Sequence, residues 1–249
     1  MSGLALLPVQ AADPVTVVAG SLPTGRANAS AVWDGTNAYA FSGFDSDFTR
    51  SDQVVRYNPA NDLADVIVGK LPFGADKTSA VWDRSNTYIF GGRSIAGPLD
   101  LVLRYDPVSD TVDIMAATLP SQREDTSATW DGANAYIFGG RDVAGSLIDE
   151  IVRYTPGPAG GAVAVMAATL PTPRSLTSAV QVGADIYIFG GLDATGFLDE
   201  IVRYSPATDT VTVMQNTLLN HFGNMGVVSD GTHAYLFGGT GRRNEIVQY

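Results

Sequence analysis

The chain has 249 residues, a formal net charge of −11 and a pI near 4.4, so it lacks the basic footprint of a general nucleic-acid-binding protein. It contains no cysteine, which excludes disulfides, thiolate catalysis and cysteine metal sites. Apolar residues make up 45%, but no run approaches the roughly 20 residues of a membrane helix. We therefore expect a soluble monomer that neither enters a membrane nor binds nucleic acid; composition fits a cytoplasmic or an exported protein equally well.

The N-terminus does not match the domain pattern that follows it. Residues 1–12 hold a short apolar run and end in Ala11 and Ala12, loosely like the end of a secretion signal. They lack a basic leader and are too short for a complete signal peptide, so an irregular tail or a cloning remnant fits better. We assign residues 1–12 to a tail and residues 13–249 to a single domain.

A short aromatic strand that ends in glycine recurs along the whole domain. Its clearest copy is Tyr136-Ile137-Phe138-Gly139-Gly140, and the last glycine of each copy follows the previous one after 48 to 51 residues. The five positions are Gly43, Gly92, Gly140, Gly191 and Gly239. A fixed period of this length is typical of repeat architectures, so the repeat and not the length sets the domain count.

Two further markers recur with the same period. One is a tyrosine, preceded by arginine in four units: Tyr57, Tyr105, Tyr154, Tyr204 and Tyr249. The other is Leu-Pro, which begins at Leu22, Leu71, Leu119 and Leu170. The third unit predicts four short strands, at about 126–130, 135–138, 150–154 and 162–167, with the tight-turn pair Asp131-Gly132 between the first two. No segment shows the period of a helix.

This unit of about 50 residues, with glycines after its second strand and a tyrosine on its third, resembles the kelch repeat. The resemblance covers five consecutive copies, and it implies an all-β fold, a β-propeller with four antiparallel strands in each blade. Val165-Met166 and Val213-Met214 stand where the family usually has a tryptophan on the fourth strand. Five units are also fewer than the six or seven that the family commonly shows.

The ends of the repeat array predict how the ring closes. The last unit stops at Tyr249, the end of a third strand, and Pro14–Val18 matches the fourth strand at Thr210–Met214. We expect this N-terminal strand to complete the last blade, giving a closed five-bladed propeller and a complete domain. Such closure joins the termini non-covalently and leaves no long open edge.

The glycine and tyrosine markers are expected to be structural. The two inner strands of each blade crowd the axis, and glycine there allows close backbone approach and positive φ. In the strand Ala135–Phe138, Tyr136 and Phe138 share one face and Ile137 faces the other way, so both faces can pack on neighbouring blades.

Arginines are distributed unevenly over the predicted loops. In a propeller of this strand order, the loops that join fourth to first strands and second to third strands share one face, called the loop face below. Eight of the 13 arginines fall there, with Lys77 nearby, namely Arg26, Arg50, Arg93, Arg123, Arg141, Arg174, Arg242 and Arg243. The opposite face has acidic turns and Arg84 as its one arginine; the turns include Asp34, Asp83, Asp131 and Asp230.

The loop face is therefore the predicted binding surface. Guanidinium groups bind carboxylates bidentately, and the kelch resemblance implies a peptide or partner protein held on this same face. The candidate ligand-binding residues are Arg26, Arg93, Arg123, Arg141, Arg174 and His221, the last because it breaks the repeat pattern. The partner expected from this chemistry is an acidic peptide or protein.

An alternative role for these arginines is to tie loops together. They have acidic neighbours in sequence: Glu124, Asp125, Asp142 and Asp193. The acidic steps Asp149-Glu150 and Asp199-Glu200, which open third strands, are likewise expected to anchor loops or pair with arginine.

No motif identifies a reaction. The two histidines, His221 and His233, fall in different loops, and no phosphate loop, dinucleotide fingerprint or zinc motif is present, so neither a cofactor nor a metal is expected. Three functions stay open: a non-catalytic binding module, an enzyme for a carbohydrate or small acid in the central depression, and a repeat-amplified or engineered scaffold without a ligand. The identity of residues 149–154 with residues 199–204 motivates the third.

Overall fold

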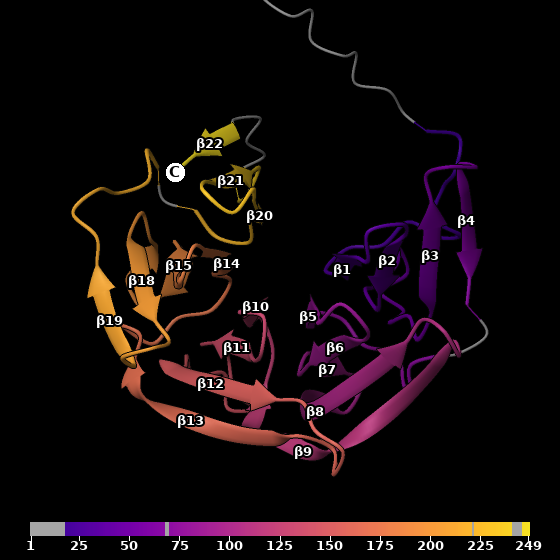
Figure 1. Ribbon diagram of the computed structural model, residues 1–249, viewed down its shortest axis with the longest axis horizontal. Helices are drawn as coiled ribbons and strands as arrows, with labels where there is room; N and C mark the ends of the chain where they lie inside the picture. The colour runs from indigo at the N-terminus through magenta and orange to yellow at the C-terminus, as the bar shows by residue number, and fades with distance from the viewer. Residues whose placement is uncertain (1–17, 68–69, 221, 241–245) are drawn as a thin grey trace, which may run out of the picture.

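The computed structural model describes residues 18–67, 70–220, 222–240 and 246–249, and in these ranges it consists of β-strands and their connections. Five antiparallel blades follow one another around an axis (Figure 1), which confirms the all-β, five-bladed propeller. The described residues contain no helix long and apolar enough to cross a membrane.

The strands of the first three blades follow the chain from the inside of the ring outward. Blade 1 comprises β1 (Ser30–Trp33), β2 (Ala38–Phe41), β3 (Val54–Asn58) and β4 (Leu63–Val66). Blade 2 comprises β5 (Ser79–Trp82), β6 (Thr87–Phe90), β8 (Gly97–Asp106) and β9 (Thr111–Arg123), with β7 (Arg93–Ser94) on its loop. Blade 3 comprises β10 (Ser127–Trp130), β11 (Ala135–Phe138), β12 (Glu150–Thr155) and β13 (Ala162–Thr169), each within two residues of its prediction.

Blades 4 and 5 repeat the order. Blade 4 comprises β14 (Ser178–Val182), β15 (Asp185–Phe189), β18 (Ile201–Ser205) and β19 (Thr210–Val213), with the hairpin β16 (Leu192–Asp193) and β17 (Gly196–Phe197) on its loop. Blade 5 has three described strands, β20 (Gly226–Ser229), β21 (Ala234–Phe237) and β22 (Ile246–Gln248).

The hydrophobic core lies between blades and is built around the tyrosine of each third strand. Tyr154 of β12 packs on Tyr88 and Phe90 of β6 in the preceding blade, with ring-centroid distances of 5.1 Å and 5.6 Å. Equivalent triads join Tyr105 to Tyr39 and Phe41, Tyr204 to Tyr136 and Phe138, and Tyr249 to Tyr187 and Phe189. Tyr105, Tyr154 and Tyr204 are fully buried, so the aromatic strand of the repeat is the main contact between neighbouring blades.

A belt of backbone hydrogen bonds also joins the blades near the axis. It is made by one residue at the equivalent loop position of each blade, all with φ between 54° and 57°: Asn28, Lys77, Asp125, Leu176 and Asn224. From Lys77 onward, each donates its N–H to the carbonyl of the preceding member, with N···O distances of 2.9, 3.3, 3.0 and 2.7 Å. This belt could not be predicted from the sequence, because the residues that adopt the left-handed conformation here are of four different non-glycine types.

Gly92 illustrates why the repeat ends in glycine. Its φ is +91°, and a Cβ there would lie 2.7 Å from the carbonyl oxygen of Asp76 and closer still to the Thr78 side chain. We expect Gly92→Ala to lower the free energy of unfolding by about 1 to 3 kcal/mol from backbone strain, with the clash adding to it. Gly35→Ala is the matched control, since Gly35 has φ +100° but open space around it. Equal losses in chemical denaturation of the two variants would show that crowding at Gly92 does not matter.

The predicted closing strand falls almost wholly outside the described residues, as does the tail at residues 1–12. Closure of the last blade by residues 14–18 therefore stays a prediction. Figure 1 shows the described part of the ring, with blades 1 and 5 on either side of a break.

Candidate functional site

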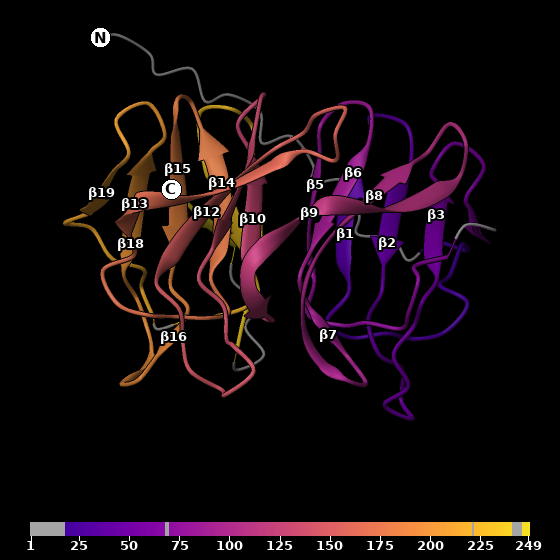
Figure 2. The ribbon, with the colours of Figure 1, turned by 90° about the horizontal axis from the view of Figure 1, so that it is seen from below.

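The loops that were predicted to share one face do so. Figure 2 shows β7 and β16, which follow the glycine pairs of blades 2 and 4, at the same end of the molecule. Isolated bridges pair each of these loops with the loop that enters the same blade: Asp76 with Arg93, Glu124 with Arg141, and Ser175 with Leu192. A further bridge, Leu198 with Phe222, joins the loop of blade 4 to the loop that enters blade 5. Both sets of loops thus form one continuous surface.

Two of the candidate arginines are buried under this surface. Arg123 and Arg174 are 0% and 1% exposed, and each donates from Nη2 to a third-strand carboxylate, Glu150 or Glu200, at 2.6 Å. Each also donates to the hydroxyl of the residue two positions earlier: Arg123 to Ser121 at 2.7 Å, and Arg174 to Thr172 at 2.9 Å. These contacts tie loops together, as the alternative reading expected, and the acidic steps at Glu150 and Glu200 pair with arginine as predicted.

The other candidates are placed differently. Arg26 donates to Gln53 Oε1 at 2.9 Å and to the Ser42 carbonyl at 3.2 Å, and burial lowers its pKa. Arg141 is half-buried and donates to the Gly145 carbonyl at 3.3 Å. His221 lies outside the described residues.

The structure brings a cluster of charges together around the loops of blades 1 to 3. Lys77 Nζ lies 3.0 Å from Glu124 Oε1 and 3.0 Å from Asp125 Oδ2, and Arg93 Nη1 lies 3.0 Å from Glu124 Oε2. Arg50 pairs with Asp76 in the same way, through its Nε. These six residues are called the loop-face cluster below.

The cluster is layered, with carboxylates below and cations above. The side chains of Glu124, Asp125 and Asp76 are 5%, 11% and 3% exposed. Those of Arg93, Lys77 and Arg50 are 43%, 26% and 28% exposed. The solvent-facing layer is therefore cationic, although the cluster as a whole is balanced.

Two of the cations, Lys77 and Arg93, have pKa values raised by their carboxylate partners. Burial alone lowers the pKa of Lys77, but hydrogen bonds to Asp125 and Glu124 outweigh it and raise that pKa above its ordinary value. The hydrogen bond to Glu124 raises the pKa of Arg93. Burial alone raises the pKa of Glu124, yet Lys77 and Arg93 bring it below the ordinary value, whereas burial of Asp125 outweighs Lys77 and leaves its pKa raised.

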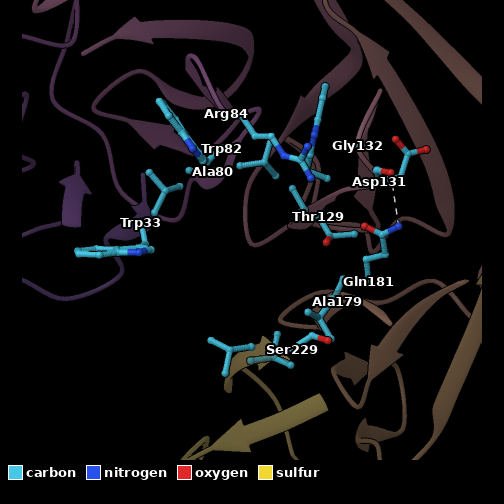
Figure 3. A pocket seen from close by; sticks show the side chains of 17 residues that line it. Trp33, Ala80, Trp82, Arg84, Thr129, Asp131, Gly132, Ala179, Gln181 and Ser229 are labelled. Carbon is cyan, nitrogen blue, oxygen red and sulfur yellow. Dashed lines mark hydrogen bonds between the residues drawn. The ribbon is translucent and has the colours of Figure 1, made fainter. Parts of the chain in front are cut away.

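A separate cavity of about 660 Å³ opens at the axis on the opposite face, where the inner strands end. Figure 3 shows Trp33, Trp82, Thr129, Gln181 and Ser229 around it, one from each blade in turn, with Arg84 extending across from the Trp82 side. Small and apolar residues make up most of the remaining lining.

This axial cavity offers little for catalysis. The one carboxylate in its lining, Asp131, accepts the N–H groups of Ala133 and Asn134 within its own turn, at 2.8 Å and 2.7 Å. Gln181 Nε2 is engaged with the Asp131 and Gly183 carbonyls. No three His, Asp or Glu side chains among the described residues are grouped to hold a metal. The enzyme alternative gains no acid–base pair here.

Comparison with known proteins agrees with the repeat pattern. A family model described as Kelch motif matches residues 173–217. The solved structure of YjhT superposes with a TM-score of 0.82 over 96% of this chain and 86% of that chain, at 14% sequence identity. No curated protein matches the chain in a sequence search. The chain is a five-bladed β-propeller, and the segment around its fourth blade matches the kelch motif.

Proposed function

We propose that the protein is a non-catalytic binding module whose loop face holds an acidic segment of a peptide or partner protein. The observation that carries this proposal is the layering of the loop-face cluster. Arg50, Lys77 and Arg93 face solvent, and the carboxylates that fix them lie beneath.

Fixing the cations in advance favours binding. A free lysine or arginine side chain loses rotamer freedom when it grips a ligand, which costs about 0.5 to 1.5 kcal/mol for each residue. Arg93 and Lys77 have lost much of that freedom already, because both are anchored on Glu124. Their outward N–H groups can then meet a carboxylate at lower cost.

The structure changes which arginines should contact a ligand. Arg93 and Arg141 of the original set remain available, and Arg50 and Lys77 join them. Arg123 and Arg174 would act by positioning the loops. Since buried carboxylates partly offset the cations, we expect modest affinity that falls as salt is raised.

A selection from a random peptide library tests the proposal. We expect the recovered peptides to be enriched in Asp and Glu, and to bind an Arg93→Gln/Arg141→Gln variant far less well. Arg84→Gln, on the opposite face, is the matched control and should bind like the parent protein. Peptides without acidic enrichment, or binding that survives the loop-face substitutions, would overturn the proposal.

A further inference from the structure

Blade 5 exposes an apolar face that the other blades bury. In blades 1 to 4 the phenylalanine that ends the second strand is 0% exposed in every case: Phe41, Phe90, Phe138 and Phe189. The equivalent Phe237 is 42% exposed. Beside it, Val228 of β20 and Ile246 of β22 are 55% and 66% exposed. This is the face that, by the repeat, turns toward the next blade in the ring.

Blade 1 exposes the complementary face. Its third-strand tyrosine, Tyr57, is the counterpart of the fully buried Tyr105, Tyr154 and Tyr204, yet it is half-buried and has no aromatic ring partner among the described residues. Trp33, at the end of β1, is 51% exposed, whereas its counterparts Trp82 and Trp130 are partly buried. The five blades thus form four junctions with one another. One blade face without a neighbouring blade remains at each end of the array, and the two faces are complementary.

The axial belt ends at the same two places. Four of its links are formed, and the carbonyl of Asn224 and the N–H of Asn28 are its two ends. Within the described residues no hydrogen bond joins these two groups. One more residue in the same left-handed conformation, with its N–H on Asn224 and its carbonyl on Asn28, would make the belt continuous.

The chain also marks the position of a blade ahead of blade 1. Ala19 and Gly20 donate to the Asp62 carboxylate at 2.7 Å and 3.0 Å, in the turn between β3 and β4. At the end of β13, Ala167 and Ala168 donate to Asp209 in the corresponding turn of blade 4, at 2.8 Å and 3.4 Å. Ala19 and Gly20 therefore lie where the outer strand of a preceding blade ends.

We propose that the exposed faces of blades 1 and 5 are the two walls of a docking site for one further kelch blade. Such a blade would set its third-strand tyrosine against Tyr235 and Phe237 of β21. Its second-strand Tyr–Phe pair would cover Tyr57, as Tyr88 and Phe90 cover Tyr154. One blade can cover both exposed faces and link both ends of the belt. Blades 2, 3 and 4 each do the same, since each packs on the blade before it and on the blade after it.

Two other arrangements fit the walls less well. Direct contact between blades 1 and 5 would close the belt, but the structure holds the two faces apart and exposed (Figure 1). A second copy of the chain offers only the same two faces. Two copies joined through these faces would form a ring of ten blades. Such a ring has a larger radius than the one that the four belt links impose on a single chain.

The experiment appends a blade of the chain's own sequence. A second copy of residues 155–204, placed after Tyr249, supplies a fourth strand for blade 5 and three strands of a new blade. The parent and the extended chain both carry Trp82→Phe and Trp130→Phe, so that Trp33 alone fluoresces. We expect the extended chain to show a higher Tm, a blue-shifted Trp33 emission and several-fold weaker acrylamide quenching.

A matched extension separates docking from mere added length. In this control the appended copies of Tyr187, Phe189 and Tyr204 are all serine, and we expect Trp33 to stay as accessible as in the parent. Unchanged Trp33 quenching in the first extended chain would overturn the proposal. So would a parent chain whose Trp33 is already protected, which indicates direct closure, or a parent that forms dimers in sedimentation, which indicates a second copy.

Discussion

Tyr154→Ala is expected to lower the free energy of unfolding by about 3 to 5 kcal/mol, the usual loss for truncating a large buried aromatic side chain. Tyr154 is 0% exposed and packs on Tyr88 and Phe90 across the junction of blades 2 and 3. Its removal leaves a cavity at a contact that every formed junction repeats. Chemical denaturation followed by circular dichroism measures the loss.

Tyr57→Ala is the matched control for Tyr154→Ala. The two tyrosines hold the same position in the repeat, but Tyr57 is only half-buried, at one end of the blade array, and makes no ring contact among the described residues. We expect its substitution to cost much less. If the two substitutions destabilise the protein equally, the junction between blades 5 and 1 is formed in solution, and the proposed docking site is wrong.

Glu200→Ala is expected to lower the free energy of unfolding by about 3 kcal/mol, because it leaves the charge of Arg174 buried without its counter-ion. Arg174 is 1% exposed, and its Nη1 has no hydrogen-bond partner, so Glu200 carries most of the compensation for its charge. Replacing both partners, as Glu200→Ala with Arg174→Met, removes the charge along with the pair. The double variant should therefore be more stable than Glu200→Ala alone.

The surface pair of Arg104 and Asp113 provides the control for Glu200→Ala. Its side chains are 38% and 51% exposed, so Asp113→Ala should cost less than about 1 kcal/mol. A small loss for Glu200→Ala as well, of the same size as for Asp113→Ala, would mean that Arg174 reaches solvent and does not hold the loops.

The blades could be predicted from sequence because each carries local signals that depend little on the rest of the fold. Asp131-Gly132 forms a tight turn in which Asp131 caps its own N–H groups, and Gly132 has φ +102°. The strand Ala135–Phe138 has the predicted bounds and is buried on both faces. Both features follow from a few adjacent residues, and they recur: the Asp-Gly pair in three blades and the aromatic strand in all five.

The candidate site could be predicted only in part. The sequence places Arg93, Arg123 and Arg174 alike in loops of the same face, yet among these three only Arg93 is exposed. The burial of each arginine depends on where its carboxylate partner lies. Arg123 and Arg174 pair with Glu150 and Glu200 beneath the loops and are buried, whereas Arg93 lies above the buried Glu124 and stays exposed. These carboxylate partners lie 26 to 31 residues from their arginines in sequence, so no local sequence pattern predicts the pairing.

The exposed faces at the two ends of the blade array could not be predicted from the sequence, and closure of the last blade by residues 14–18 stays a prediction. The repeat count and the match of residues 14–18 to a fourth strand predicted direct closure of the last blade. A count of strands carries no information on how far each blade turns about the axis, which depends on packing between blades. The exposure of Phe237 and Trp33, set against their buried counterparts, supplies that information.

The central claim is that exposed cations of the loop face bind an acidic ligand, and calorimetric titration of an acidic peptide tests it most directly. The peptide is titrated at low and at physiological salt into the parent, the Arg50→Gln/Arg93→Gln/Arg141→Gln variant and the Arg84→Gln control. We predict that the triple variant binds at least about tenfold more weakly, equivalent to about 1.4 kcal/mol, and that the control keeps the parent affinity. Equal affinity of the parent and the triple variant at low salt would contradict the account.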